Sequence, residues 1–350
     1  MKNVVFILPN LSQGGAQKVF LEILPKLSPK NKYHLFVLNE ARKDFEVLPQ
    51  YYEIHELHSS RTIFSFFRLV KKLRELEPDT VFSTLYHVNI LCSIASFFLK
   101  KKPVLNFQEA NTPSVQLIGL KKLPARILLS LFYPKAHKIL CLSEHMKKDL
   151  HANFGLDNQK LVVIYNPASN KGLKETVTEN PFSKFGNGPH ILAVGRLNYQ
   201  KDYPYLIEKF YSFKRELSSA HLWILGTGEL ESDLKDLIKK MKLEDSVHLE
   251  GFQKETNKYY QHTDLFVMSS IFEGTPNVLM EALQTHCPIL IRKHHGGTEE
   301  VMNILGISDR YVDDLIFENS FFQPLPEDAF EKLRAEFSLE KIASQYESLI

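Results

Sequence analysis

Short runs of consecutive apolar residues alternate with segments of helical periodicity along this chain, and the alternation occurs twice. Continuous apolar runs are typical of parallel strands that are buried on both faces. Strands that alternate with helices predict doubly wound parallel sheets. The expected strands lie at 3–8, 34–38, 80–83, 104–107, 138–142 and 161–165, and then at 190–194, 221–225, 247–249, 265–268 and 288–291.

The stretch 166–189 interrupts this alternation with prolines and glycines among polar residues, which is the composition of a linker. At 350 residues the chain is long enough for two domains of about 150 residues each. We therefore predict an α/β protein with two Rossmann-like, doubly wound domains, one over 1–168 and one over 169–335. We expect a last helix, at about 338–350, to pack back on the first domain.

Composition excludes several classes of protein. With 44% hydrophobic and 24% charged residues, the chain is ordinary globular material and not a disordered, collagen-like or coiled-coil protein. The longest apolar stretch, 90–99, is too short to span a bilayer. The three cysteines are odd in number and lack ligand spacing, and the histidines form no metal-binding motif. These features fit a protein of the reducing cytoplasm without a bound metal.

Charge is unevenly divided along the chain, although the net charge is only +2. Residues 1–170 hold 23 Lys and Arg against 13 Asp and Glu, and the remainder holds 20 against 28. A basic half joined to an acidic half indicates that the first half faces an anionic partner. A chance distribution of solvated surface charge is the alternative.

In doubly wound sheets ligands bind at the carboxyl ends of strands, so the loops there are candidate sites. Gly14-Gly15 follows the first strand and precedes a helix, where glycines let a phosphate approach the helix N-terminus. A tight turn is the structural alternative. The loop lacks the Gly-x-Gly-x-x-Gly pattern of nicotinamide and flavin enzymes, and no Gly-Lys-Ser/Thr follows, which excludes a P-loop.

Charged residues follow two strands of the second half. Arg196, next to Gly195, and Lys201 come after the strand 190–194, where two cations can neutralise a diphosphate. Glu273 follows the strand 265–268, and Glu281 lies in a helix expected to begin near Pro276. Such carboxylates can bind sugar hydroxyls or act as acids and bases. Solvated surface charge is the alternative for each.

Together these residues resemble a known family. Gly14-Gly15, Gly195-Arg196 with Lys201, and Glu273-Gly-Thr-Pro-Asn-Val-Leu-Met-Glu281-Ala-Leu are similar to the signature of the retaining glycosyltransferases of family four. These nucleotide-sugar enzymes have the GT-B fold, in which two Rossmann-like domains face each other across a cleft. The spacing of the two glutamates is the most specific feature, and the resemblance covers residues 4–350.

The resemblance implies a role for each residue. Arg196 and Lys201 would neutralise the nucleotide diphosphate during catalysis, Glu273 would bind the donor-sugar hydroxyls, and Glu281 would hold the ribose. The family retains the anomeric configuration and needs neither a metal nor another cofactor. The remaining donor-binding residues would be Gly14, Gly15, Gly195, Gly274, Thr275, Pro276 and Asn277.

The chain departs from the family pattern in three places. Many relatives have a histidine after the strand that corresponds to 104–107, and this chain has none there. Glu109, Asn111 and His87 are the candidates for the sugar contact that this histidine makes. His294-His295 replaces small residues, and 304–323 lacks the usual Gly-Leu-Leu run, which leaves recognition of the donor base open.

The acceptor of GT-B enzymes binds mainly to the N-terminal domain, which is the basic half here. Stretches 61–72 and 117–132 mix basic and bulky apolar residues at helical spacing, as interfacial helices do, and 100–102 adds three lysines. We therefore expect this half to rest on an anionic membrane at its cytoplasmic face and to take a lipid-linked acceptor. Helices that pack only on their own sheet are the alternative.

The expected function is transfer of a sugar from a UDP-linked donor to a glycan or lipid-linked saccharide in surface polysaccharide biosynthesis. A sugar-nucleotide epimerase on the same fold and a non-catalytic sugar- or polyanion-binding module are the alternatives. A nucleic-acid partner is not expected, because the basic half has no aromatic-interleaved recognition motif.

Overall fold

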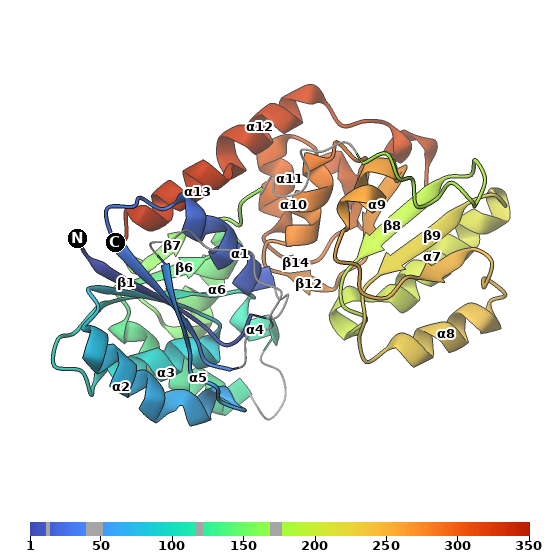
Figure 1. Cartoon of the computed structure of the whole chain (residues 1–350). Coiled ribbons are helices and arrows are strands. Elements are labelled where there is room, and N and C mark those ends of the chain that lie inside the picture. Colours follow the sequence, from blue (N-terminus) through green and yellow to red (C-terminus); the bar gives the residue numbers. More distant parts are fainter. Residues whose placement is uncertain (12–14, 40–51, 117–121, 169–176) are drawn as a thin grey trace. The chain divides into compact units, whose positions relative to one another are not determined.

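The computed structural model describes residues 1–11, 15–39, 52–116, 122–168 and 177–350, which form two compact units (Figure 1). Unit 1 consists of Met1–Pro167 and Leu339–Ile350, and unit 2 consists of Ala168–Ser338. The chain therefore passes from one unit to the other after Pro167 and again after Ser338.

Unit 1 is built on a seven-stranded sheet in which all paired strands are parallel, in the order β3-β2-β1-β4-β5-β6-β7. This sheet confirms the predicted doubly wound fold. One strand, β3, was not predicted, because only its first residue is buried and it lacks an apolar run. The strands are β1 (Asn3–Leu8), β2 (Lys32–Val37), β3 (Tyr52–Glu56), β4 (Thr80–Thr84), β5 (Val104–Gln108), β6 (Lys138–Cys141) and β7 (Leu161–Val163).

Helices cover both faces of this sheet, and each face has its own apolar core. Residues of α2 (Phe66–Leu76), α3 (Tyr86–Ser96), α5 (Lys122–Phe132) and α6 (Glu144–Phe154) pack in one cluster. Residues of α1 (Gly15–Ile23) and α13 (Leu339–Glu347) pack in the other. A short helix, α4 (Pro113–Gln116), follows β5.

The last helix, α13, completes the core of unit 1. Tyr346 is 1% exposed, and its ring packs against those of Phe20 and Phe82 at centroid distances of 6.0 Å and 5.8 Å. The helix begins at Leu339, because Ser338 has extended backbone angles and ends the preceding helix.

Unit 2 has a six-stranded sheet in the order β10-β9-β8-β11-β13-β15, again with parallel pairs. A separate two-stranded ladder joins β12 to β14. The strands are β8 (His190–Val194), β9 (His221–Leu225), β10 (Val247–Leu249), β11 (Leu265–Met268), β12 (Phe272–Glu273), β13 (Ile289–Arg292), β14 (His295–Gly296) and β15 (Tyr311–Val312). The helices are α7 (Tyr203–Glu216), α8 (Glu231–Lys240), α9 (Asn257–His262), α10 (Asn277–Gln284), α11 (Thr298–Leu305) and α12 (Glu327–Phe337).

Within the ranges that the structure describes, every helix is too short or too polar to cross a lipid bilayer. This agrees with the expectation from the apolar stretches of the sequence.

Replacing Tyr346 with Ala should destabilise unit 1 by about 3–5 kcal/mol, because it removes a fully buried aromatic ring from between two others. Urea unfolding followed by circular dichroism measures this loss, while fluorescence of the single tryptophan, Trp223, reports unit 2 separately. The matched control is Ser344→Ala on the exposed side of the same helix, and an equal effect of both changes would contradict the packing role.

Candidate functional site

The strand order of unit 2 places a topological switch point between β8 and β11. From β8 the chain moves outward in one direction to β9 and β10, and β11 begins the other half of the sheet beside β8. Ligands of open α/β sheets bind outside the carboxyl ends of strands at such a point. The loops that follow β8 and β11 carry the predicted residues Lys201 and Glu273.

These two predicted residues meet in a buried ion pair. The Lys201 Nζ atom lies 2.6 Å from Glu273 Oε1, and the side chains are 14% and 9% exposed. Two charges at this depth are stable only when hydrogen bonds satisfy their remaining polar atoms. The surroundings of Glu273 provide such bonds.

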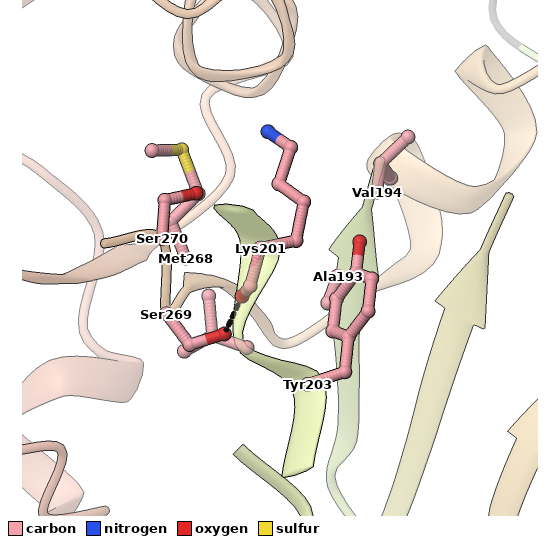
Figure 2. A pocket seen from close by; sticks show the side chains of 8 residues that line it. Ala193, Val194, Lys201, Tyr203, Met268, Ser269 and Ser270 are labelled. Carbon is pink, nitrogen blue, oxygen red and sulfur yellow. Dashed lines mark hydrogen bonds between the residues drawn. The ribbon is translucent and has the colours of Figure 1, made fainter. Parts of the chain in front are cut away.

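Two further side chains donate hydrogen bonds to the Glu273 carboxylate. Ser270 Oγ donates to Oε1 at 2.8 Å, and Gln200 Nε2 donates to Oε2 at 3.1 Å. Ser269 Oγ donates to the Lys201 carbonyl oxygen at 2.7 Å (Figure 2), which joins the segments that follow β8 and β11. The carboxylate is therefore held in one orientation by residues from both sides of the switch point.

The electrostatic balance favours the ionised form of Glu273. Burial acts to raise its pKa, but the ammonium of Lys201, together with the hydrogen bond from Ser270, outweighs burial and lowers the pKa below its usual range. The site therefore presents a carboxylate at neutral pH.

Glycine permits the close packing that holds Glu273 in place. Gly296 on β14 has φ of 137°, and a Cβ atom there would overlap the carbonyl oxygen of Glu273 on the paired strand β12. A side chain at position 296 would push the two strands apart. Gly195 plays a similar part after β8, where a Cβ atom would lie 2.6 Å from Cε of Lys201.

Arg196 lies at the same edge of the sheet but has a different environment. Its side chain is exposed and forms no hydrogen bond or ion pair with the part of the chain that the structure describes. Arg196 is thus a solvated cation next to the buried Lys201–Glu273 pair. Among the residues that the structure describes, no carboxylate pairs with this positive charge.

The loop between β12 and α10 holds the next group of predicted residues. Gly274, Thr275 and Pro276 are buried, and α10 begins directly after them at Asn277. The first turn of α10 has no acidic residue and no side-chain cap at Pro276. Such a helix N-terminus favours an anion.

Glu281 lies on α10 in an environment separate from that of Glu273. The Tyr260 hydroxyl donates a hydrogen bond to Glu281 Oε2 at 3.1 Å. Tyr260 is buried, and burial beside Glu281 raises its pKa well above the usual value, so the hydroxyl keeps its proton. The structure therefore fixes the position of Glu281 through α9.

His294, a departure from the family pattern, is part of this site. Its Nδ1 atom lies 2.8 Å from the Arg292 carbonyl oxygen and its Nε2 atom lies 2.8 Å from Thr298 Oγ1. Burial lowers its pKa, and in the neutral ring Nδ1 must carry the proton because a carbonyl oxygen only accepts. His294 thus stands beside Glu273 as a fixed, neutral side chain.

The candidates from unit 1 occupy three different environments. Glu109 is 2% exposed and accepts hydrogen bonds from Asn89 Nδ2 at 3.1 Å and from the Tyr133 hydroxyl. Burial raises its pKa to about 8, so the carboxyl group is largely protonated at neutral pH. Asn111 is half-buried, and His87 is exposed in the first turn of α3.

Two predicted glycines cannot be placed in the same detail. Gly14 lies outside the described residues, and Gly15 is the first residue of α1. Their contact with a phosphate stays a prediction.

The sequence analysis did not identify Gln200, Ser270 and Gly296, which shape the site. Gln200 immediately precedes Lys201, and Ser270 lies three residues before Glu273, so a search for polar neighbours of the two charges could have found them. Gly296 had no such signal, because its role depends on the pairing of β12 with β14.

Replacing Lys201 with Met should destabilise unit 2 by about 3–5 kcal/mol at neutral pH, because it leaves the Glu273 carboxylate buried without its cation. The pKa of Glu273 in the folded protein then rises above that of the unfolded chain, so the loss relative to wild type should shrink as the pH falls into the acid range. Urea unfolding followed by Trp223 fluorescence across pH measures both effects.

Lys235→Met is the matched control, since Lys235 pairs with Glu231 at 2.7 Å on an exposed helix surface. Exposed pairs contribute about 1 kcal/mol or less. Similar losses for the two lysine variants would show that the Lys201–Glu273 pair has no special role in stability.

Comparison with known families matches both halves of the chain. The family described as Glycosyltransferase Family 4 matches residues 13–169, and the family described as Glycosyl transferases group 1 matches residues 175–305.

Named relatives align along most of the chain. A Campylobacter jejuni protein, N-acetylgalactosamine-N,N'-diacetylbacillosaminyl-diphospho-undecaprenol 4-alpha-N-acetylgalactosaminyltransferase, is 33% identical over 340 residues, which cover 93% of this chain and 89% of the relative. The amylovoran biosynthesis glycosyltransferase AmsD of Erwinia amylovora is 24% identical over 341 residues, which cover 97% of this chain and 93% of the relative.

Solved structures share the fold at low sequence identity. Anabaena HepE in complex with UDP-glucose superposes with a TM-score of 0.79 at 17% identity, over 100% of this chain and 99% of that one. Sucrose-phosphate synthase of Thermosynechococcus elongatus superposes with a TM-score of 0.76 at 14% identity, over 100% and 98%. With two doubly wound units and a relative of this similarity, the chain belongs to the group 1, family 4 glycosyltransferases and has the GT-B fold.

Proposed function

We propose that this glycosyltransferase moves a sugar from a UDP-sugar to a lipid-linked saccharide or glycan with retention of anomeric configuration, in the biosynthesis of a surface polysaccharide. The observation that carries this proposal is the Lys201–Glu273 pair at the switch point of unit 2, with Arg196 exposed beside it. The names of relatives support the class of pathway, because the Campylobacter jejuni protein is named for a diphospho-undecaprenol substrate and AmsD for amylovoran biosynthesis. The complexes of HepE with UDP and with UDP-glucose support a UDP-linked donor.

Lys201 and Arg196 would neutralise the diphosphate of the donor. The Lys201 ammonium has three N–H groups, and its hydrogen bond to Glu273 uses one of them. The others are available to a phosphate oxygen, while Arg196 can bind phosphate through two parallel N–H groups. Stabilising the leaving diphosphate by fixed cations lowers the barrier to transfer.

Glu273 would bind hydroxyls of the donor sugar. An ionised carboxylate has about four acceptor positions, and Lys201, Ser270 and Gln200 occupy three. The remaining position can accept one sugar hydroxyl without breaking the existing bonds. The Lys201 ion pair keeps the carboxylate ionised for this contact.

The remaining donor contacts come from the same edge of the unit. The N-terminus of α10, with Gly274, Thr275, Pro276 and Asn277, would lie against the sugar and phosphate, and Glu281 would bind the ribose. These groups and the two cations supply the positive charge that the diphosphate needs. The proposal therefore assigns no metal or other cofactor to the transfer reaction.

Glu273→Gln should lower kcat for sugar transfer by about 100-fold or more, because an amide cannot serve as a charged acceptor and loses the ion pair with Lys201. Transfer from a panel of UDP-sugars to a lipid-linked saccharide measures this effect, and NMR of the product identifies the anomer. UDP binding, followed by thermal shift, should persist and shows that the variant is folded.

Glu244→Gln, an exposed carboxylate elsewhere in unit 2, is the matched control and should leave kcat unchanged. An inverted product would contradict retention. A Glu273→Gln variant with more than half of the wild-type kcat would contradict the role of this residue.

Arg196→Ala should raise KM for the UDP-sugar about tenfold or more, since it removes a charge-assisted hydrogen bond to phosphate. Steady-state kinetics of both proteins in excess EDTA measure this change in KM. Wild-type activity in EDTA also tests whether transfer proceeds without a metal. Lys254→Ala, another exposed cation of unit 2, provides the control. Equal KM values for wild type and Arg196→Ala would exclude a diphosphate contact.

We also propose that unit 1 docks on an anionic lipid surface to reach its acceptor. Three neighbouring helices of unit 1, α2, α3 and α5, pack together on one face of the sheet (Figure 1). These helices and the residues at their ends expose large apolar side chains to solvent: Ile63 (69%), Phe64 (63%), Phe67 (83%), Phe97 (53%), Phe98 (50%), Leu123 (67%), Ile127 (51%) and Leu131 (62%).

Cations accompany this exposed apolar group. Lys71, Lys100, Lys101 and Arg126 are exposed in the same segments, and Lys135 lies over the Phe97 ring at 5.0 Å. Exposed apolar side chains with flanking cations are typical of helices that lie in the interface of an anionic membrane. Each cation near such a surface contributes about 1 kcal/mol of attraction. The predicted stretch 117–121 lies outside the described residues.

Phe67→Gln combined with Leu131→Gln should weaken binding to vesicles of anionic phosphatidylglycerol, because both side chains are exposed and apolar. Flotation with phosphatidylglycerol and with phosphatidylcholine vesicles measures binding, and recovery should fall at high salt. Ile316→Gln, which replaces an exposed apolar residue of unit 2, is the control. Equal recovery with both lipids would contradict docking on anionic lipid.

A further inference from the structure

A group of three potential metal ligands lies at the edge of the sheet in unit 1 and shares no residue with the proposed sugar-transfer site of unit 2. His34 belongs to β2, and Glu53 and His55 belong to the edge strand β3. His34 pairs with Glu53 in the strand register, and His55 is the next residue of β3 whose side chain points to the same face. These ligands form no motif in the sequence, because they come together only through the pairing of β2 with β3.

The three ligand atoms form a compact triangle. His34 Nδ1 lies 3.2 Å from His55 Nε2 and 3.3 Å from Glu53 Oε2, and His55 Nε2 lies 3.6 Å from the same carboxylate oxygen. In a tetrahedral site with zinc–ligand bonds of about 2.0–2.1 Å, neighbouring ligand atoms are about 3.3 Å apart. The triangle therefore has the dimensions of one face of a zinc tetrahedron.

Hydrogen bonds alone do not satisfy these atoms when both rings are neutral. The triangle then contains at most the N–H of His34 Nδ1 and the N–H of His55 Nε2, and because these nitrogens are 3.2 Å apart, two protons there would repel each other. With a single N–H in the triangle, two of the three atoms face each other with lone pairs and no proton between them. A cation at the centre accepts all three lone pairs at once.

Packing holds the rings in this arrangement. His34 is 3% exposed, and the His55 ring packs against Phe36 at a centroid distance of 4.9 Å. Glu53 is more exposed and leaves the fourth coordination position open to water.

We propose that His34, Glu53 and His55 form a binding site for a divalent transition metal, with zinc as the ion that fits the triangle. A bound ion would link the edge strand β3 to β2 and so stabilise this edge of the sheet. Two features predict moderate affinity. The first is that His34 Nε2 is buried without a hydrogen-bond partner in the described part of the chain, whereas strong zinc sites orient both ring nitrogens. The second is that Lys32 and Lys72 lie within electrostatic range of the rings, where their positive charge opposes a bound cation.

The test uses the full chain after removal of metals with EDTA and dialysis. Zinc titration by calorimetry and metal analysis after gel filtration should find about one zinc per chain, and zinc should raise Tm by about 2–4 °C. Magnesium should have no effect, because it prefers oxygen ligands.

Glu53→Gln and His55→Gln should each weaken zinc binding at least tenfold and remove the Tm increase. Both positions are partly exposed, so the variants should fold, and their folding is checked by circular dichroism without metal. His58→Gln is the matched control, because His58 forms a similar exposed pair with Glu56 at 3.6 Å. Failure to bind zinc at this stoichiometry, or unchanged binding in either ligand variant, would overturn the proposal.

Discussion

The buried ion pair between Lys201 and Glu273 determines how the site of unit 2 is built. A carboxylate this far from water is stable only with a cation and hydrogen bonds around it, and each of these partners comes from a loop at the β8–β11 switch point. The pair therefore fixes the two loops relative to each other as well as the carboxylate. The pair is neutral as a whole, whereas Arg196 adds a cation that stays in solvent.

Much of the fold follows from the sequence because the central strands are buried on both faces. The runs 3–8 and 190–194 coincide with β1 and β8. Both have an apolar residue at almost every position, which is typical of a strand buried on both faces. The edge strand β3 could not be recognised in the same way, since exposed residues such as Glu53 and Glu56 interrupt it and leave no apolar run. Its existence depends on hydrogen bonding to β2, which is a tertiary property.

The site was predictable in its charges but not in its contacts. Lys201 and Glu273 were predicted because they follow strands at the ligand-binding edge of the sheet, and because the spacing of Glu273 and Glu281 resembles that of the family. Their meeting across 72 residues could not be derived, since it depends on the pairing of β8 with β11 in the folded sheet. The burial of Glu109 could not be predicted either. It depends on hydrogen bonds from Asn89 and Tyr133, which are distant in sequence and hold Glu109 inside unit 1.

The uneven charge of the sequence also gains a physical explanation from the fold. A basic surface alone would attract any polyanion, but the cations of unit 1 accompany exposed aromatic and aliphatic side chains, which a hydrated polyanion cannot bury. The anionic membrane proposed as the docking surface would offer both negative charge and an apolar interior, and so would satisfy both kinds of group. A lipid-linked acceptor is confined to such an interface, so the surface that binds the membrane would also bring the enzyme to the molecule on which it acts.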